Sequence, residues 1–137
     1  ELLASGRDLY DPYIATRLAA GAEIAAADYI TMHRDRAAVC AEVAALTRPF
    51  DALILPTTPT LPPALAGLQG TDILMKNSAR ILRNTALSNY LDRPTITIPG
   101  HAPGTAPTGV SLIGSHRHDR RLLAIAAGLE DIIRVKA

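Results

Sequence analysis

The chain has 137 residues, of which 48% are hydrophobic, and this is enough for one compact unit but not for two. The net charge is +1 and basic residues are scattered among acidic ones, which argues against binding to nucleic acid. No apolar run is long enough to span a bilayer, and the single cysteine, Cys40, cannot form an internal disulfide. We therefore expect a cytoplasmic protein that binds neither nucleic acid nor a membrane. The sequence starts at Glu1 rather than at a methionine, from which we expect a piece of a longer protein.

Residues 1–49 are predicted to be helical. Asp11 precedes Pro12, and a carboxylate followed by a proline is typical of a helix start. Apolar residues recur from there at helical spacing, with a weak point at Gly21, until the pattern ends before Pro49.

Two features of this helical region receive no functional assignment. The charged residues Arg34, Asp35 and Arg36 follow one another directly, which indicates a solvated helix face. Cys40 falls on an apolar helix face, which indicates a small core residue rather than a reactive thiol.

Residues 50–115 are predicted to contain the strands. A short apolar run at 51–56, bounded by prolines, indicates a buried strand. The Pro/Thr-rich segment 56–63 is expected to be a rigid, extended loop, because each proline removes a backbone donor and restricts the residue before it. Such a loop can hold the hydroxyls of Thr57 and Thr58 at the mouth of a cleft, where a substrate would meet them. The alternative is that these hydroxyls only satisfy backbone groups of the loop.

The second half continues with a helix, a hairpin and a last helix. Apolar residues at helical spacing predict a helix over 72–89. Two β-like runs, 94–99 and 109–114, are joined by a Pro/Gly-rich connection and predict a hairpin. Asp119 is expected to cap a terminal helix over 119–135. The order of elements predicts an α/β fold.

Polar side chains cluster inside the helix predicted over 72–89. Arg83, Asn84 and Thr85, with Asn89 one turn later, lie between two predicted strands. They either bond to strand ends and helix termini or contact a substrate. Asn84 and Thr85 therefore join Thr57 and Thr58 as predicted substrate-binding residues.

The search for a catalytic group gives no candidate. Ser115 and His116 are adjacent, but adjacent side chains on an extended or turn segment diverge, so they are not a nucleophile with its base. His116 and His118 flank the cation Arg117, and no third ligand has suitable spacing for a metal. We predict no catalytic residue in this chain, no metal and no cofactor.

Short motifs follow one another in a fixed order along the chain. They are Ala26-Ala27-Asp28-Tyr29, Phe50-Asp51-Ala52-Leu53-Ile54-Leu55-Pro56-Thr57-Thr58-Pro59, Leu82-Arg83-Asn84-Thr85, Arg93-Pro94-Thr95-Ile96-Thr97-Ile98-Pro99, Pro107-Thr108-Gly109-Val110-Ser111-Leu112-Ile113-Gly114 and Asp119-Arg120-Arg121-Leu122-Leu123. Together they resemble the C-terminal region of amidase-signature enzymes, and the resemblance spans nearly the whole chain.

The resemblance implies an α/β fold in which residues 1–137 form the C-terminal portion of an amidase domain, with strands of a mixed β-sheet covered by helices. It also implies hydrolysis of a small-molecule carboxylic amide to an acid and ammonia or an amine, through a triad of Ser, a second Ser with a cis peptide, and Lys. The Gly/Ser-rich signature that carries this triad is absent from the sequence, so we expect the chain alone to be inactive. The sequence departs from the family pattern at 91–93, where a small-residue Gly turn is usual, and at Ala106 and Thr108, so pocket shape does not transfer.

Three hypotheses follow from the sequence. The first is a fragment of an amidase. The second is a non-catalytic, truncated paralogue that acts as a structural or oligomerisation module, whose uncovered apolar face pairs with a second copy, as a homodimer, or with a partner subunit. The third is an independent small binding module with a Pro-rich recognition loop, which predicts a stable monomer.

Overall fold

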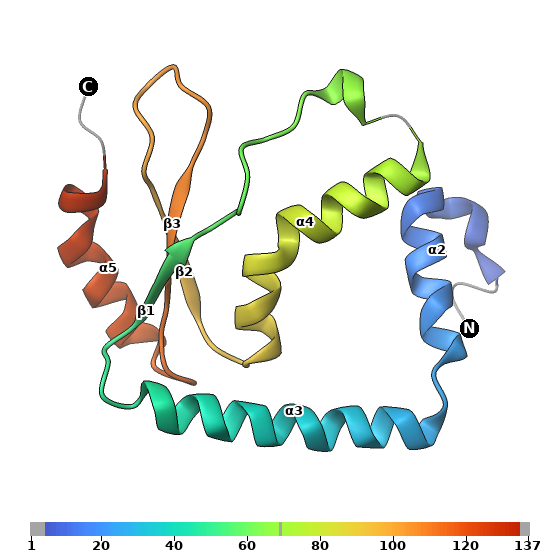
Figure 1. Cartoon of the computed structure of the whole chain (residues 1–137), viewed down its shortest axis with the longest axis horizontal. Helices are drawn as coiled ribbons and strands as arrows, with labels where there is room; N and C mark the ends of the chain where they lie inside the picture. Colours follow the sequence, from blue (N-terminus) through green and yellow to red (C-terminus); the bar gives the residue numbers. More distant parts are fainter. Residues whose placement is uncertain (1–4, 69, 135–137) are drawn as a thin grey trace.

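A three-stranded antiparallel sheet forms the centre of the fold in the computed structural model, which describes residues 5–68 and 70–134 (Figure 1). The strands are β1 (Leu53–Pro56), β2 (Thr95–Pro99) and β3 (Gly109–Ile113), in the order β1-β3-β2. β2 and β3 form the predicted hairpin, and both neighbouring pairs are antiparallel. The α/β prediction is confirmed, while the parallel pairing that a mixed sheet requires does not occur among the described strands.

The hydrophobic core lies between the hairpin and α5 (Asp119–Ile133). Ile98 and Leu112 from the sheet pack against Leu122 and Ala126, which lie one turn apart on the same face of α5. The apolar periodicity of this helix therefore predicts its packing correctly. The core is small because the other described helices do not contribute fully buried residues to it.

The terminal helix differs from the prediction at both ends. Its N-cap is His118, which makes no side-chain capping bond, and Asp119 is the first helical residue rather than the cap. A carboxylate in the first turn still interacts favourably with the positive end of the helix dipole. The helix ends at Ile133, and position 135 of the predicted range lies outside the described residues.

The first third is helical, as predicted. In α2 (Pro12–Ala20), the Asp11 carboxylate accepts hydrogen bonds from the backbone N–H groups of Tyr13 at 2.9 Å and Ile14 at 3.3 Å. The weak point at Gly21 becomes a break, since a short 3₁₀ turn, η2 (Gly21–Glu23), separates α2 from α3 (Ala26–Thr47). Two further 3₁₀ turns are η1 (Arg7–Leu9) and η3 (Leu65–Gly67).

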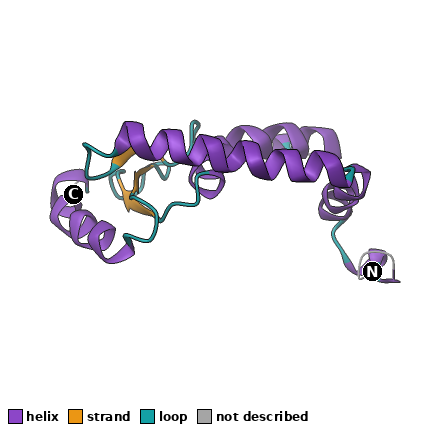
Figure 2. Cartoon of the chain, turned by 90° about the horizontal axis from the view of Figure 1, so that it is seen from below, coloured by secondary structure: helices purple, strands orange, loops and turns teal. Residues whose placement is uncertain are grey.

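The two longest helices of the described residues are α3 and α4 (Thr71–Tyr90). α3 runs along one side, with the sheet and α5 at its C-terminal end and α2 at its N-terminal end (Figures 1 and 2). α4 returns toward α3 and leads into β2. No helix among the described residues has both the length and the hydrophobicity that crossing a bilayer would require.

The predicted burial of the 51–56 strand is wrong for one of its faces. β1 is an edge strand, and Ile54 is 65% exposed while Leu53 and Leu55 are half-buried. Ile54 lies opposite Leu112 and therefore on the sheet face that α5 covers, but α5 packs on β2 and β3 and leaves the edge strand exposed. An apolar strand at an edge indicates a surface that a further element covers.

Much apolar surface of the described residues is uncovered. The accessible surface is 10135 Å², whereas about 6,900 Å² is expected for a compact monomer of this mass. α3 has 22 residues and none of them is fully buried. Exposed apolar side chains on α3 include Tyr29, Met32 and Leu46. The chain is therefore loosely packed, and its hydrophobic core is confined to the region where the hairpin packs on α5.

Candidate substrate-binding region

Three hydroxyl groups meet where the chain leaves β1. The Oγ1 atom of Thr57 lies 2.8 Å from Oγ of Ser111 and 3.2 Å from Oγ1 of Thr97, and the latter two atoms are 3.1 Å apart. Each hydroxyl can donate one hydrogen bond and accept two, so the three close a ring in which every proton is used. Ser111 is buried and faces Thr97 across the hairpin register. Thr57 therefore retains only an acceptor lone pair for another molecule.

Asn84 lies against the same end of β1. Its Nδ2 donates a 2.7 Å hydrogen bond to the carbonyl oxygen of Pro56, and its Oδ1 accepts a 3.4 Å bond from Nε of Arg83. The backbone N–H of Thr57 donates to the carbonyl oxygen of Gly109 at 2.8 Å. The peptide bond between Pro56 and Thr57 is thus held by α4 on one side and by β3 on the other. The structure brings Asn84 and Thr57 together from positions far apart in the sequence.

The other two predicted residues make local hydrogen bonds. Oγ1 of Thr58 donates to the carbonyl oxygen of Thr60 at 3.0 Å, and Oγ1 of Thr85 donates to the carbonyl oxygen of Leu82 at 3.1 Å. Thr85 lines a cavity of about 440 Å³ between α2 and α4, away from the end of β1. Thr57, Thr58 and Asn84 therefore form one region, and Thr85 belongs to another.

The buried serines of the described region are committed to neutral partners. Oγ of Ser88 donates to the carbonyl oxygen of Thr85 at 3.0 Å, and Oγ of Ser111 belongs to the hydroxyl ring. An activated serine needs a base beside it. Neither hydroxyl has a lysine or histidine partner among the residues that the structure describes.

A second region is a cleft of about 810 Å³ along α3, which we call the α3 cleft. His33, Arg36 and Arg48 line it from the α3 side. The opposite wall is built by the turn between α4 and β2 and by the loop between β3 and α5, and it includes Arg93 and His116. Sequence reasoning missed this cleft, because its lining residues come from segments far apart in the sequence.

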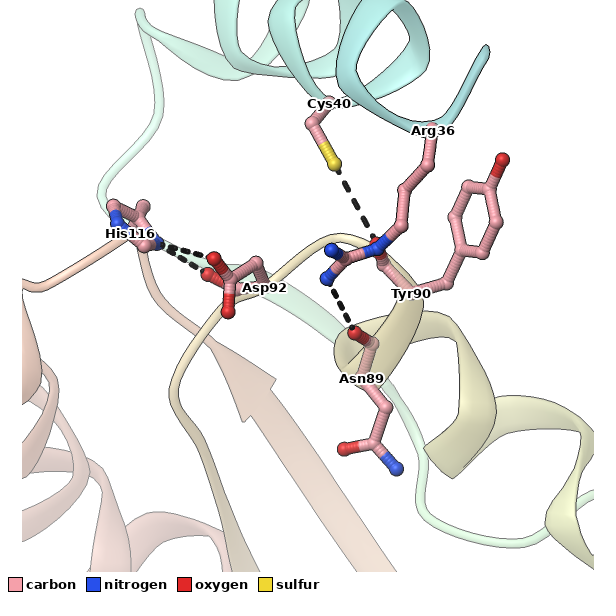
Figure 3. A network of polar contacts seen from close by, with 6 residues as sticks. All are labelled: Arg36, Cys40, Asn89, Tyr90, Asp92 and His116. Carbon is pink, nitrogen blue, oxygen red and sulfur yellow. Dashed lines mark hydrogen bonds and ion pairs between the residues drawn. The ribbon is translucent and has the colours of Figure 1, made fainter. Parts of the chain in front are cut away.

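Arg36 holds the C-terminus of α4 at this cleft. Its Nε donates to the carbonyl oxygen of Tyr90 at 2.7 Å, and its Nη2 donates to that of Asn89 at 3.2 Å (Figure 3). Sγ of Cys40 lies 3.5 Å from the same Tyr90 oxygen. The last carbonyl groups of a helix have no partner within the helix, so a guanidinium is well suited to them. The solvated-face prediction for Arg36 and the core prediction for Cys40 are both corrected, since each half-buried side chain binds α4.

Asp92 and His116 connect the two segments that build the opposite wall of the α3 cleft, the turn between α4 and β2 and the loop between β3 and α5. Nδ1 of His116 lies 2.6 Å from the carbonyl oxygen of Asp92 and 3.5 Å from its Oδ2 (Figure 3). Asp92 has a φ of 55°, in the left-handed region that usually requires glycine. The departure from a Gly turn at 91–93 thus concerns a position where the backbone adopts a glycine-like conformation. Within the described residues, no three His, Cys, Asp or Glu side chains are placed to hold a metal ion.

A profile of the family described as Amidase matches residues 4–123. The chain belongs to the amidase family. A crystal structure of an amidase has the same fold over 96% of this amidase-family chain, with a TM-score of 0.77 and 24% identity, and the chain corresponds to 31% of that structure.

Two curated proteins are similar in sequence to this member of the amidase family. The 2-amino-5-chloromuconic acid deaminase of Comamonas testosteroni is 30% identical over 124 residues, which are 90% of this chain and 27% of the relative. One subunit of the glutamyl-tRNA(Gln) amidotransferase of Sulfolobus acidocaldarius is 27% identical over 104 residues, which are 76% of this chain and 21% of the relative. The chain spans about a quarter of the length of these relatives.

Proposed function

We propose that this chain is the C-terminal segment of an amidase that hydrolyses a small-molecule carboxylic amide to an acid and ammonia or an amine. The observation that carries the proposal is the amidase-family match over residues 4–123 in a chain that spans about a quarter of its curated relatives. The proposal places the triad of Ser, cis-Ser and Lys in the upstream part of the parent protein. A cytoplasmic location belongs to the same proposal.

The uncovered surface supports the proposal that this chain packs against other parts of a longer protein. The accessible surface exceeds the expectation for a compact monomer by about 3,200 Å². A stable interface between proteins buries about 1,200–2,000 Å² in total, so the excess is enough for extensive packing against further chain. The exposed side of α3 and the edge strand β1 are the surfaces that such packing would cover.

Within this proposal, the region around Thr57, Thr58 and Asn84 forms part of the wall of the substrate pocket. Thr57 can offer a substrate only an acceptor lone pair, because its proton is used in the hydroxyl ring. Asn84 uses one amide proton on Pro56 and retains the other. Thr85 would act from the separate cavity between α2 and α4.

A serine-directed fluorophosphonate probe and a panel of simple amides test the proposal. Incubated alone, the 137-residue chain should acquire no probe mass and release no ammonia. The parent protein should be labelled at a serine upstream of this segment and should release ammonia. Labelling of Ser115 or Ser88 with turnover would overturn the proposal, and Ser115→Ala and Ser88→Ala would identify which serine is responsible.

A second candidate is a non-catalytic module that associates through its uncovered surface as a homodimer. The exposed edge strand β1 is the observation that favours it. Light scattering after gel filtration gives the mass of the isolated chain in solution. A parent protein that is neither labelled nor active, together with a stable dimer of the isolated chain, would favour this module over the amidase segment.

A further inference from the structure

The α3 cleft is lined by more positive than negative charge. Four arginines line it, Arg36, Arg48, Arg93 and Arg121, against two carboxylates, Asp51 and Asp92. With neutral histidines, four positive charges minus two negative charges leave a lining charge of +2. The whole chain carries a net charge of +1, so the residues outside this lining sum to about −1 and the positive charge is concentrated at this one cavity.

The hydrogen bonds decide which of these charges are compensated. Arg121 forms an ion pair with Asp51 across the end of the cleft. Within the described residues, Arg36 binds only the carbonyl oxygens at the end of α4, and Nη2 of Arg93 donates to the hydroxyl of Thr47 at 2.9 Å. Carbonyl and hydroxyl oxygens satisfy N–H groups but carry no full negative charge, and the carbonyl end of a helix offsets only part of the charge of a guanidinium.

The side chain of Arg48 has no hydrogen-bond or ion-pair partner among the residues that the structure describes. The second carboxylate, Asp92, is engaged by His116. Over residues 5–68 and 70–134, three of the four arginines therefore face the cleft without a carboxylate partner.

We propose that the α3 cleft binds a small organic molecule that carries carboxylate groups. A guanidinium matches a carboxylate in a planar, two-point geometry, and several guanidinium groups around one cavity favour an anion. The volume of about 810 Å³ lies in the range of small-molecule sites. Ala37, Ala44, Phe50 and Leu91 also line the cleft, so the ligand has an apolar body between its charged groups. This site is separate from the region around Thr57, and the proposal does not depend on amidase activity.

Titration calorimetry with glutarate tests the proposal directly on the 137-residue chain. Glutaramide, the uncharged diamide of the same carbon skeleton, is the matched ligand, and inorganic phosphate is an anion without an apolar body. Glutarate should bind measurably, and the other two should bind at least about tenfold more weakly. Equal binding of glutarate and glutaramide, no binding of glutarate, or phosphate binding as tight as that of glutarate would overturn the proposal.

Charge variants locate the site. Arg48→Gln should weaken glutarate binding about fivefold, because an exposed guanidinium contributes modestly. Arg80→Gln removes the same charge from an exposed position on α4 outside the cleft and should leave the affinity unchanged. Circular dichroism verifies that both variants fold as the unsubstituted 137-residue chain does. Equal losses in the two variants would show only a general charge effect and would refute the site. Tighter binding of a short polyglutamate peptide than of glutarate would assign the cleft to an acidic segment instead.

Discussion

The hydroxyl oxygens of Thr57 and Ser111 lie 2.8 Å apart and join the loop behind β1 to the middle strand of the sheet. Ser111 is buried, so its hydroxyl depends on this contact and on Thr97 for its hydrogen bonds. A serine held in this way orders the backbone rather than reacting. We therefore do not expect Ser111 to act as the nucleophile of the family.

Replacing Thr57 by Val should destabilise the chain by about 1 kcal/mol, because it opens the ring and removes one partner from the buried hydroxyl of Ser111. Thr57→Ser retains the hydroxyl and should lose clearly less. Urea unfolding followed by circular dichroism measures both. Equal stability of the Val and Ser variants would show that the ring contributes nothing.

Gly109→Ala should destabilise by about 1–3 kcal/mol, because an added methyl group has no space. A Cβ at this position would lie 2.6 Å from Cγ2 of Thr97 and 2.9 Å from Oγ1 of Thr57. Gly100→Ala is the matched control, since its nearest neighbour would be Cγ2 of Val110 at 3.6 Å. Thermal unfolding should separate the two variants, and similar midpoints would contradict the packing described for Gly109.

Arg36→Gln should lower the free energy of unfolding by about 1–2 kcal/mol, because two carbonyl groups at the end of α4 lose a charged donor. Arg34→Gln changes an exposed arginine of the same helix and should have an effect within about 0.5 kcal/mol. Denaturant titration of both proteins gives the comparison. A larger loss in the Arg34 variant would refute the role assigned to Arg36.

The left-handed backbone at Asp92 predicts an order of stability for two substitutions. Both Asp92→Gly and Asp92→Ala remove the carboxylate near His116, so their difference isolates the backbone. Gly should be more stable than Ala by about 1 kcal/mol, because alanine is strained at a φ of 55°. Thermal melts of the two variants test this, and a more stable Ala variant would contradict the conformation.

Most helices and strands of this chain are predictable from local patterns. Asp11 and Pro12 mark the start of α2, and apolar spacing predicts α4 and α5 within a few residues of their observed bounds. The exceptions are helix boundaries shifted by one residue, such as the N-cap of α5, which is His118 and not Asp119. Both residues are polar and adjacent, and only the backbone conformation decides between them.

The candidate sites are only partly predictable. The Pro/Thr-rich loop after the first strand indicates Thr57 as a candidate. The partners of Thr57, Thr97 and Ser111, depend on the register of the hairpin. A Pro/Gly-rich connection does not specify that register. The α3 cleft was missed for a similar reason, because Arg36 and Arg93 lie on separate elements and meet only after packing.

The sequence by itself determined the secondary structure and the family resemblance, because periodicity, prolines and short motifs are local properties of the chain. Only the tertiary structure decided that β1 is an exposed edge, that three hydroxyls form a ring, and that three arginines without carboxylate partners in the described part of the chain face one cleft. These are relations between residues distant in the sequence, and they arise when segments pack and exclude water between them.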